Sequence, residues 1–223
     1  MRLVAQELDS VGLSFAFVGG CAVWLLVDRP DLTDFRPTED VDVIIEVVTL
    51  GELYKLEEQL RAAGFQHDMS EGAPICRWIV KECRVDIMPI DSRELGMNSQ
   101  WFREALESAQ LVTVDGTLQA KVITPPLFLA TKLAAFQDRG HSDLFGSHDV
   151  EDIVTITDGC ENIVRQVGHS SPGVRKFIAD GFSVIMQHHD FNDALFGHLS
   201  AAFGARERVE EVKERFAAIR AVG

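Results

Sequence analysis

The chain has 223 residues, of which 46% are hydrophobic and 25% are charged. These proportions are typical of a globular protein that buries a sizeable core, and the length indicates one domain or two small ones. The formal net charge of −14 at pH 7 argues against broad, sequence-independent nucleic-acid binding, because such binding relies on many lysine and arginine contacts to phosphates. It does not exclude contact with only the end of an RNA.

The first half of the chain is predicted to alternate between helices and strands. At Thr49, a glutamate three residues on (Glu52) forms a capping-box pattern that starts a helix ending near Gly64. The predicted elements are, in chain order, a helix at 2–10, a strand at 15–18, a helix at 21–27, a strand at 40–47, a helix at 49–64, strands at 65–69, 75–80 and 84–90, a helix at 99–109, and strands at 111–114 and 118–122.

The apolar run from Val11 to Val27 needs separate consideration, because it could be a signal-peptide core or a membrane span. Ser14 and the glycine pair at 19–20 interrupt it, and its length is marginal for a spanning helix. We therefore expect a buried strand and helix, and no membrane partner. The four cysteines form no Cys-x-x-Cys pair, so we expect reduced thiols and a cytoplasmic location.

Two short patterns in the first half are typical of phosphate and metal chemistry. Gly19-Gly20 follows a predicted strand and precedes a predicted helix, where glycine lets backbone N–H groups approach a phosphate closely. Asp40 and Asp42 are one residue apart on a predicted strand, so their carboxylates project to the same face, and such oxygen ligands suit Mg²⁺. A tight turn and a chance Asp-x-Asp are the structural alternatives.

A third acid, Asp86, lies on the predicted strand 84–90, between Val85 and Ile87, which face the opposite way. It is either a further ligand of the same metal or a carboxylate at a sheet edge that pairs with Arg84 or Arg77. The two aspartates already placed on a neighbouring strand favour the metal.

The second half of the chain is predicted to be helical. Thr124 and Pro125 start a helix over 126–138 that is apolar nearly all round, and its one lysine is Lys132. A lysine there needs an anionic partner or must reach water, and contact with phosphate is the functional alternative. Asp149 and Asp152 share one face of the next helix. His148 with Asp152, and His188-His189-Asp190, contain too few ligands at supporting positions to predict a metal site.

The quoted motifs also resemble those of a known family. Gly19-Gly20-x-Ala22, followed by Arg36-x-Thr38-x-Asp40-Val41-Asp42, resembles the signature of the nucleotidyltransferase superfamily related to DNA polymerase β. The later Lys-x-x-Ala helix, Arg-Gly turn and Asp-x-x-Asp-Ile helix, over residues 129–156, resemble the branch that contains minimal nucleotidyltransferases and AbiEii-type toxins. The segment 28–34 is longer than is common in this family, which affects the expected rim of the pocket.

The resemblance implies an α/β fold: a small mixed sheet with flanking helices over residues 1–122, and a helical part over 123–223 that completes the cleft. It implies transfer of a nucleoside monophosphate from a nucleoside triphosphate, with two Mg²⁺ ions, or Mn²⁺ in their place. The implied metal ligands are Asp40, Asp42 and Asp86, and Asp86 also acts as the base. The implied nucleotide-binding residues are Gly19, Gly20, Thr38 and Lys132. Lys132 and Asp152 are further implied catalytic residues, with Asp149 as an additional candidate.

The acceptor is the least defined part of this prediction. The family resemblance implies a toxin that modifies the 3′ end of a tRNA and is neutralised by an antitoxin protein. Other members of the superfamily modify antibiotics or protein hydroxyls, and a domain that binds nucleotide or a partner without turnover is a further alternative. Three separately placed acids favour catalysis over binding alone.

Overall fold

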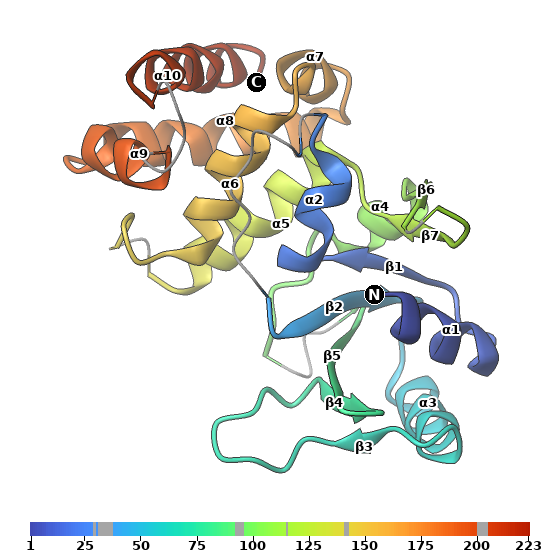
Figure 1. The fold of residues 1–223 in the computed structure, drawn as a ribbon. Helices are drawn as coiled ribbons and strands as arrows, with labels where there is room; N and C mark the ends of the chain where they lie inside the picture. Colours follow the sequence, from blue (N-terminus) through green and yellow to red (C-terminus); the bar gives the residue numbers. More distant parts are fainter. Residues whose placement is uncertain (29, 31–37, 92–95, 115, 141–142, 200–204) are drawn as a thin grey trace. The chain divides into compact units, whose positions relative to one another are not determined.

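The structure, a computed structural model, describes residues 1–28, 30, 38–91, 96–114, 116–140, 143–199 and 205–223 (Figure 1). The chain is mixed α/β, as the sequence predicted. It divides into a sheet unit, Met1–Leu25 with Arg36–Thr124, and a helical unit, Leu26–Phe35 with Pro125–Gly223, which are described separately. Within the described residues, no helix is both long enough and apolar enough to cross a membrane.

The described part of the sheet unit contains one mixed sheet of seven strands in the order β3-β4-β5-β2-β1-β7-β6. β1 pairs antiparallel with β2 and parallel with β7, β2 pairs parallel with β5, and the remaining pairs are antiparallel. The strands are β1 (Phe15–Val18), β2 (Asp40–Ile45), β3 (Gln66–His67), β4 (Arg77–Val80), β5 (Cys83–Pro89), β6 (Gln110–Thr113) and β7 (Gln119–Val122). Each predicted strand is present, most of them shorter than predicted.

The register of the central strands determines where the candidate functional residues of this unit lie. β2 is buried over its last three residues and half-buried over its first three, so its acidic end lies at the more open end of the strand. The last residue of β1, Val18, is the partner of Asp42, and Gly19 follows directly. On the other side of β2, the partner of Asp42 is Asp86 of β5. The topology therefore brings the glycine turn and two aspartates to one place.

Helices of the sheet unit agree with the sequence except behind the glycines. The helix predicted over 21–27 is a 3₁₀ turn, η1 (Gly20–Ala22), followed by the short α2 (Val23–Leu26). The capping box is confirmed, because the Thr49 hydroxyl accepts from Glu52 N–H and the Glu52 carboxylate accepts from Thr49 N–H. The other helices of this unit are α1 (Arg2–Val11), α3 (Leu50–Ala62) and α4 (Phe102–Glu107).

The turn between β4 and β5 holds two non-glycine residues in left-handed conformation, Lys81 (φ 45°) and Glu82 (φ 68°). Because a two-residue hairpin turn of this kind favours glycine at its second position, Glu82→Gly is expected to raise the free energy of unfolding by about 1 kcal/mol. Lys81 is retained, since its ammonium lies 2.6 Å from the Glu7 carboxylate. Urea denaturation measures the change. Glu58→Gly on the exposed face of α3 is the control and should lower stability by about 1 kcal/mol; loss of stability in both variants would contradict the strain argument.

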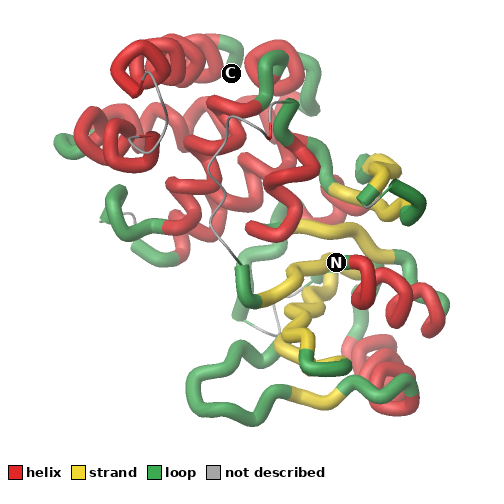
Figure 2. Tube along the Cα trace, in the orientation of Figure 1, coloured by secondary structure: helices red, strands yellow, loops and turns green. Residues whose placement is uncertain are grey.

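The helical unit has no strand among its described residues (Figure 2). α5 begins at Pro125, and Ser147 and Ser171 cap α6 and α8 through their hydroxyls. Phe216 of α10 packs between Phe182 and Phe191, with ring centroids 4.5 and 5.4 Å away. The three rings thus belong to the core of this unit. The helices are α5 (Pro125–Asp138), α6 (His148–Gly159), α7 (Ile163–Gly168), α8 (Pro172–Gln187), α9 (Phe191–Leu199) and α10 (Ala205–Ala221).

Candidate functional site

The three predicted metal ligands of the sheet unit lie on two adjacent strands. Asp42 of β2 and Asp86 of β5 are register partners, and Asp40 precedes Asp42 by two residues. Because alternate residues of a strand project to the same face, all three carboxylates lie on one face of the sheet. Two carboxylates directly opposite each other repel, so a nearby cation stabilises this arrangement.

Arg77 supplies such a cation, and it is the main residue of this cluster that the sequence did not single out as functional. It lies on β4 as the register partner of Asp86 on the side away from Asp42. Its Nε donates to Asp86 Oδ1 (2.7 Å), and its Nη2 donates to both Asp86 Oδ2 (2.8 Å) and Asp40 Oδ2 (2.5 Å). The hydrogen bonds with Asp86 raise the pKa of Arg77 further above its ordinary value. Asp86 therefore pairs with an arginine, as expected of a purely structural carboxylate. It also lies on the strand next to Asp42, as expected of a metal ligand.

Gly19 brings backbone directly against the Asp42 carboxylate. Its φ of 65° with ψ of −168° is a conformation open essentially to glycine alone. A Cβ at this position would lie 1.9 Å from Asp42 Oδ2. Only glycine therefore fits here. Gly20 begins η1, and because the helix behind it is short, the helix dipole adds little to anion binding at this turn.

The remaining residues near the glycine turn have minor roles. Cys21 is buried, its thiol donates to the Val18 carbonyl (3.2 Å), and burial raises its pKa to about 12, so it stays protonated and is no nucleophile at neutral pH. Thr38 is half-buried two residues before β2. Arg36 and Pro37 of the motif lie outside the described residues.

The helical unit holds a second charged cluster, between α5 and α6. Lys132 Nζ lies 2.6 Å from Asp152 Oδ2 and 3.4 Å from Asp149 Oδ1. Arg139, near the end of α5, also pairs with Asp149. Both aspartates are almost fully buried and face α5. Lys132 thus has anionic partners, which is the first of the two alternatives given from the sequence. Its ammonium is paired with these carboxylates and does not extend mainly to water.

The contact between Lys132 and Asp152 is chiefly electrostatic. Asp152 Oδ2 has no well-aligned hydrogen-bond donor among the described residues, although the ammonium nitrogen lies close to it. Such an oxygen in a buried position depends on the nearby positive charge. Removal of the lysine would leave a buried carboxylate without compensation.

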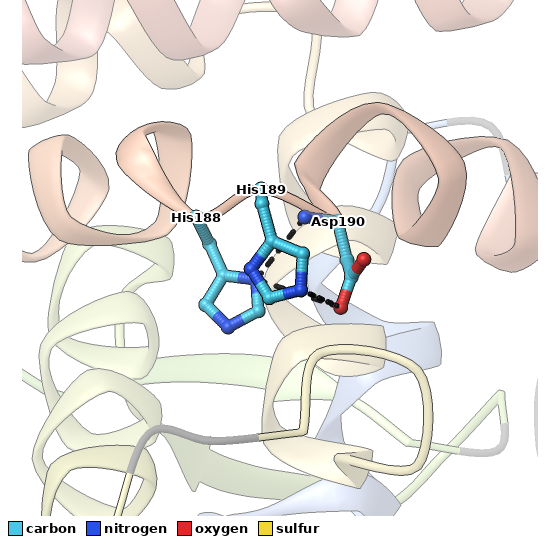
Figure 3. Close-up of side chains that lie close together, drawn as sticks. All are labelled: His188, His189 and Asp190. Atoms are coloured by element: carbon cyan, nitrogen blue, oxygen red, sulfur yellow. Dashed lines mark hydrogen bonds and ion pairs between the residues drawn. The ribbon is translucent and has the colours of Figure 1, made fainter.

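The histidine clusters noted in the sequence are not organised as metal sites. His148 pairs with Glu151 rather than Asp152. The donor atoms of His188, His189 and Asp190 all lie within 4.8 Å of one another (Figure 3). However, the two rings stack with centroids 4.5 Å apart, and His188 Nδ1 accepts a hydrogen bond from Asp190 N–H. Ring nitrogens bind metals in the ring plane, so stacked rings do not direct both lone pairs to one ion.

One charged cluster therefore stands out in each unit: Asp40, Asp42, Asp86 and Arg77 in the sheet unit, and Lys132, Arg139, Asp149 and Asp152 in the helical unit. The carboxylate oxygens of the first cluster suit a hard divalent ion. No protein-family model matches the chain, and no curated protein matches it in sequence. The function is therefore argued from the chemistry of the two clusters and from the motifs.

Proposed function

We propose that the protein is a metal-dependent nucleotidyltransferase, which moves a nucleoside monophosphate from a nucleoside triphosphate to an acceptor hydroxyl and releases pyrophosphate. The observation that carries this proposal is the register of β2 with β5, which places Asp42 opposite Asp86 while Gly19 packs against Asp42. Carboxylates on one sheet face beside a glycine turn combine ligands for a cation with backbone open to a phosphate.

The donor set fits Mg²⁺, or Mn²⁺ in its place, because all three side chains offer oxygen and two of them are oriented by register. When bound, two such ions neutralise charge on the attacking and leaving oxygens of an in-line displacement. In this proposal Asp40 and Asp42 hold the ions. Asp86 binds one of them and accepts the proton of the acceptor hydroxyl. The protein's own contribution is then positioning and charge compensation.

The other motif residues have binding roles in this proposal. Gly19 and Gly20 leave backbone open to the triphosphate, and Thr38 contacts the nucleotide. By the family resemblance, Lys132 binds phosphate oxygens, and Asp152, its ion-pair partner, orients the ammonium. A lysine already held by a carboxylate has little rotamer freedom left to lose when it binds a phosphate.

The direct test is label transfer from each of four α-³²P nucleoside triphosphates, with Mg²⁺ and total cellular RNA. We expect label on an RNA band from the wild type, and a loss of about 10³-fold in Asp42→Asn, which keeps the side chain's shape and removes its charge. Asp180→Asn, on the exposed side of α8, is the matched control and should transfer label like the wild type. Equal transfer by Asp42→Asn would refute the metal assignment.

The same assay identifies the acceptor class. Label on a tRNA-sized band supports the tRNA-modifying reading, and growth arrest on expression without a partner protein would support the toxin. Label on the protein itself, or on added antibiotic, supports the other acceptors known in the superfamily. Nucleotide binding without any transfer would make the chain a binding domain of this fold.

A further inference from the structure

We propose that Arg77 is a built-in counter-cation that sets how strongly the aspartate cluster binds its divalent ion. This inference rests on the proposed function, since it takes Asp40, Asp42 and Asp86 as the metal ligands. It adds Arg77, which no motif contains, as a residue that competes with the ion for two of them.

The contacts of Arg77 place its guanidinium among the metal ligands themselves. One nitrogen, Nη2, donates to Asp40 and to Asp86 at once, and thus lies between carboxylates of two adjacent strands. Nε takes the second oxygen of Asp86, so both oxygens of that carboxylate are bound to one guanidinium. This two-point geometry is specific to arginine, because a lysine ammonium offers no planar fork.

The strand order explains why the arginine reaches this position. Asp86 lies between Arg77 on β4 and Asp42 on β2, so one carboxylate has a cation on one side and an anion on the other. To reach Asp40 the guanidinium extends past Asp86 to the next strand. The Arg77 side chain is only 17% exposed, which limits the screening of its charge by water.

The three carboxylates are not gathered around one point in this arrangement. Among the described residues, Asp40, Asp42 and Asp86 do not form a group whose donor atoms all lie within 4.8 Å of one another. A divalent ion shared by these ligands requires oxygens that Arg77 holds, and it also meets the positive charge of the guanidinium. For the ion to bind, at least Asp40 must therefore exchange its hydrogen bond with Arg77 for a bond to the ion.

A consequence follows for the order of binding. The exchange weakens ion binding to the protein alone, whereas a nucleoside triphosphate brings oxygens and negative charge that offset Arg77. The ion is thus expected to bind tightly only together with the nucleotide. Arg77 keeps one of its two hydrogen bonds to Asp86 and so orients the third carboxylate as a positioning residue, while the other Asp86 oxygen binds the ion.

The test is Mn²⁺ binding to the full chain without nucleotide, followed by the electron paramagnetic resonance signal of free Mn²⁺. Arg77→Met should bind Mn²⁺ about 10-fold more tightly than the wild type, because the competing cation is gone. Arg61→Met removes the same charge from α3, where the exposed Arg61 pairs with Glu57 one helical turn away, and should stay within about two-fold of the wild type. Arg77→Lys keeps the charge and should lie between wild type and Arg77→Met.

The outcomes separate this inference from the proposed function. If Arg77→Met binds Mn²⁺ no more tightly than the wild type, while Asp42→Asn abolishes binding, the metal site stands and the role of Arg77 is wrong. Equally tight Mn²⁺ binding by Arg61→Met would show that only the net charge matters, and would also overturn the role of Arg77. If no variant binds Mn²⁺, with or without nucleotide, both proposals fail. Circular dichroism confirms folding of each variant, and Arg77→Lys carries the test if Arg77→Met does not fold.

Discussion

Replacing Gly19 with alanine is expected to lower the free energy of unfolding by about 3 kcal/mol and to abolish nucleotidyl transfer. Two effects combine at this position. The backbone has φ of 65° and ψ of −168°, which alanine does not adopt without strain. In addition, the new methyl group would lie 1.9 Å from Asp42 Oδ2, so either the turn or the Asp42 carboxylate must move.

Urea denaturation and label transfer, measured on the same preparation, check this expectation. Gly12→Ala is the matched control, because Gly12 also has a positive φ (75°) but its Cβ would meet no atom within 4 Å. It should show the conformational strain alone, about 1 kcal/mol, and keep activity. If Gly19→Ala were as stable and as active as Gly12→Ala, the close packing of the Gly19 backbone against the Asp42 carboxylate would matter for neither stability nor transfer.

The aspartate cluster was predictable from the sequence because strand periodicity acts over one or two residues. Asp40 and Asp42 are on the same strand, and a spacing of two places both on one face whatever the sheet order is. Asp86 needed only the further assumption that its strand lies next to β2, and β2 and β5 are indeed neighbours. Asp40 and Asp42 therefore followed from a local pattern, and Asp86 from a local pattern together with an assumed strand order.

The sequence named Arg77 only as one of two arginines that could pair with Asp86, because the choice between them depends on a register. The sequence predicted a link of three residues, 81–83, between the two strands, which would pair Trp78 with Asp86. In the structure Cys83 already belongs to β5 and pairs with Val80, so the turn has two residues and Arg77 is opposite Asp86. A change of one residue in a turn moves every partner and exchanges the two faces. A prediction of left-handed conformations at residues 81 and 82 would have given the two-residue turn and the correct register.

The helix behind the glycines and the partners of Lys132 illustrate two other limits. Residues 21–27 are apolar enough for a helix, but η1 and α2 divide the segment, and composition does not reveal such a division. Asp149 and Asp152 were correctly placed on one helix face. That this face meets Lys132 depends on how α5 packs against α6, which no local pattern determines.

Replacing Lys132 with methionine is expected to lower the free energy of unfolding by about 3 kcal/mol, because it leaves the buried Asp152 carboxylate without its cation. Arg139 still pairs with Asp149, so the loss concerns Asp152. Lys176→Met is the matched control: Lys176 pairs with Asp180 on the surface, with both side chains well exposed, and its removal should change stability by less than about 0.5 kcal/mol.

The double variant Lys132→Met with Asp152→Leu separates stability from function. Both charges are removed together, so an apolar pair replaces a buried ion pair, and stability should return to within about 1 kcal/mol of the wild type. If Lys132 binds the triphosphate, the double variant stays inactive in label transfer although it is stably folded. If it regains transfer together with stability, Lys132 and Asp152 only hold α5 against α6, and the phosphate must be bound by other residues. Urea denaturation and label transfer on the single and double variants decide between these roles.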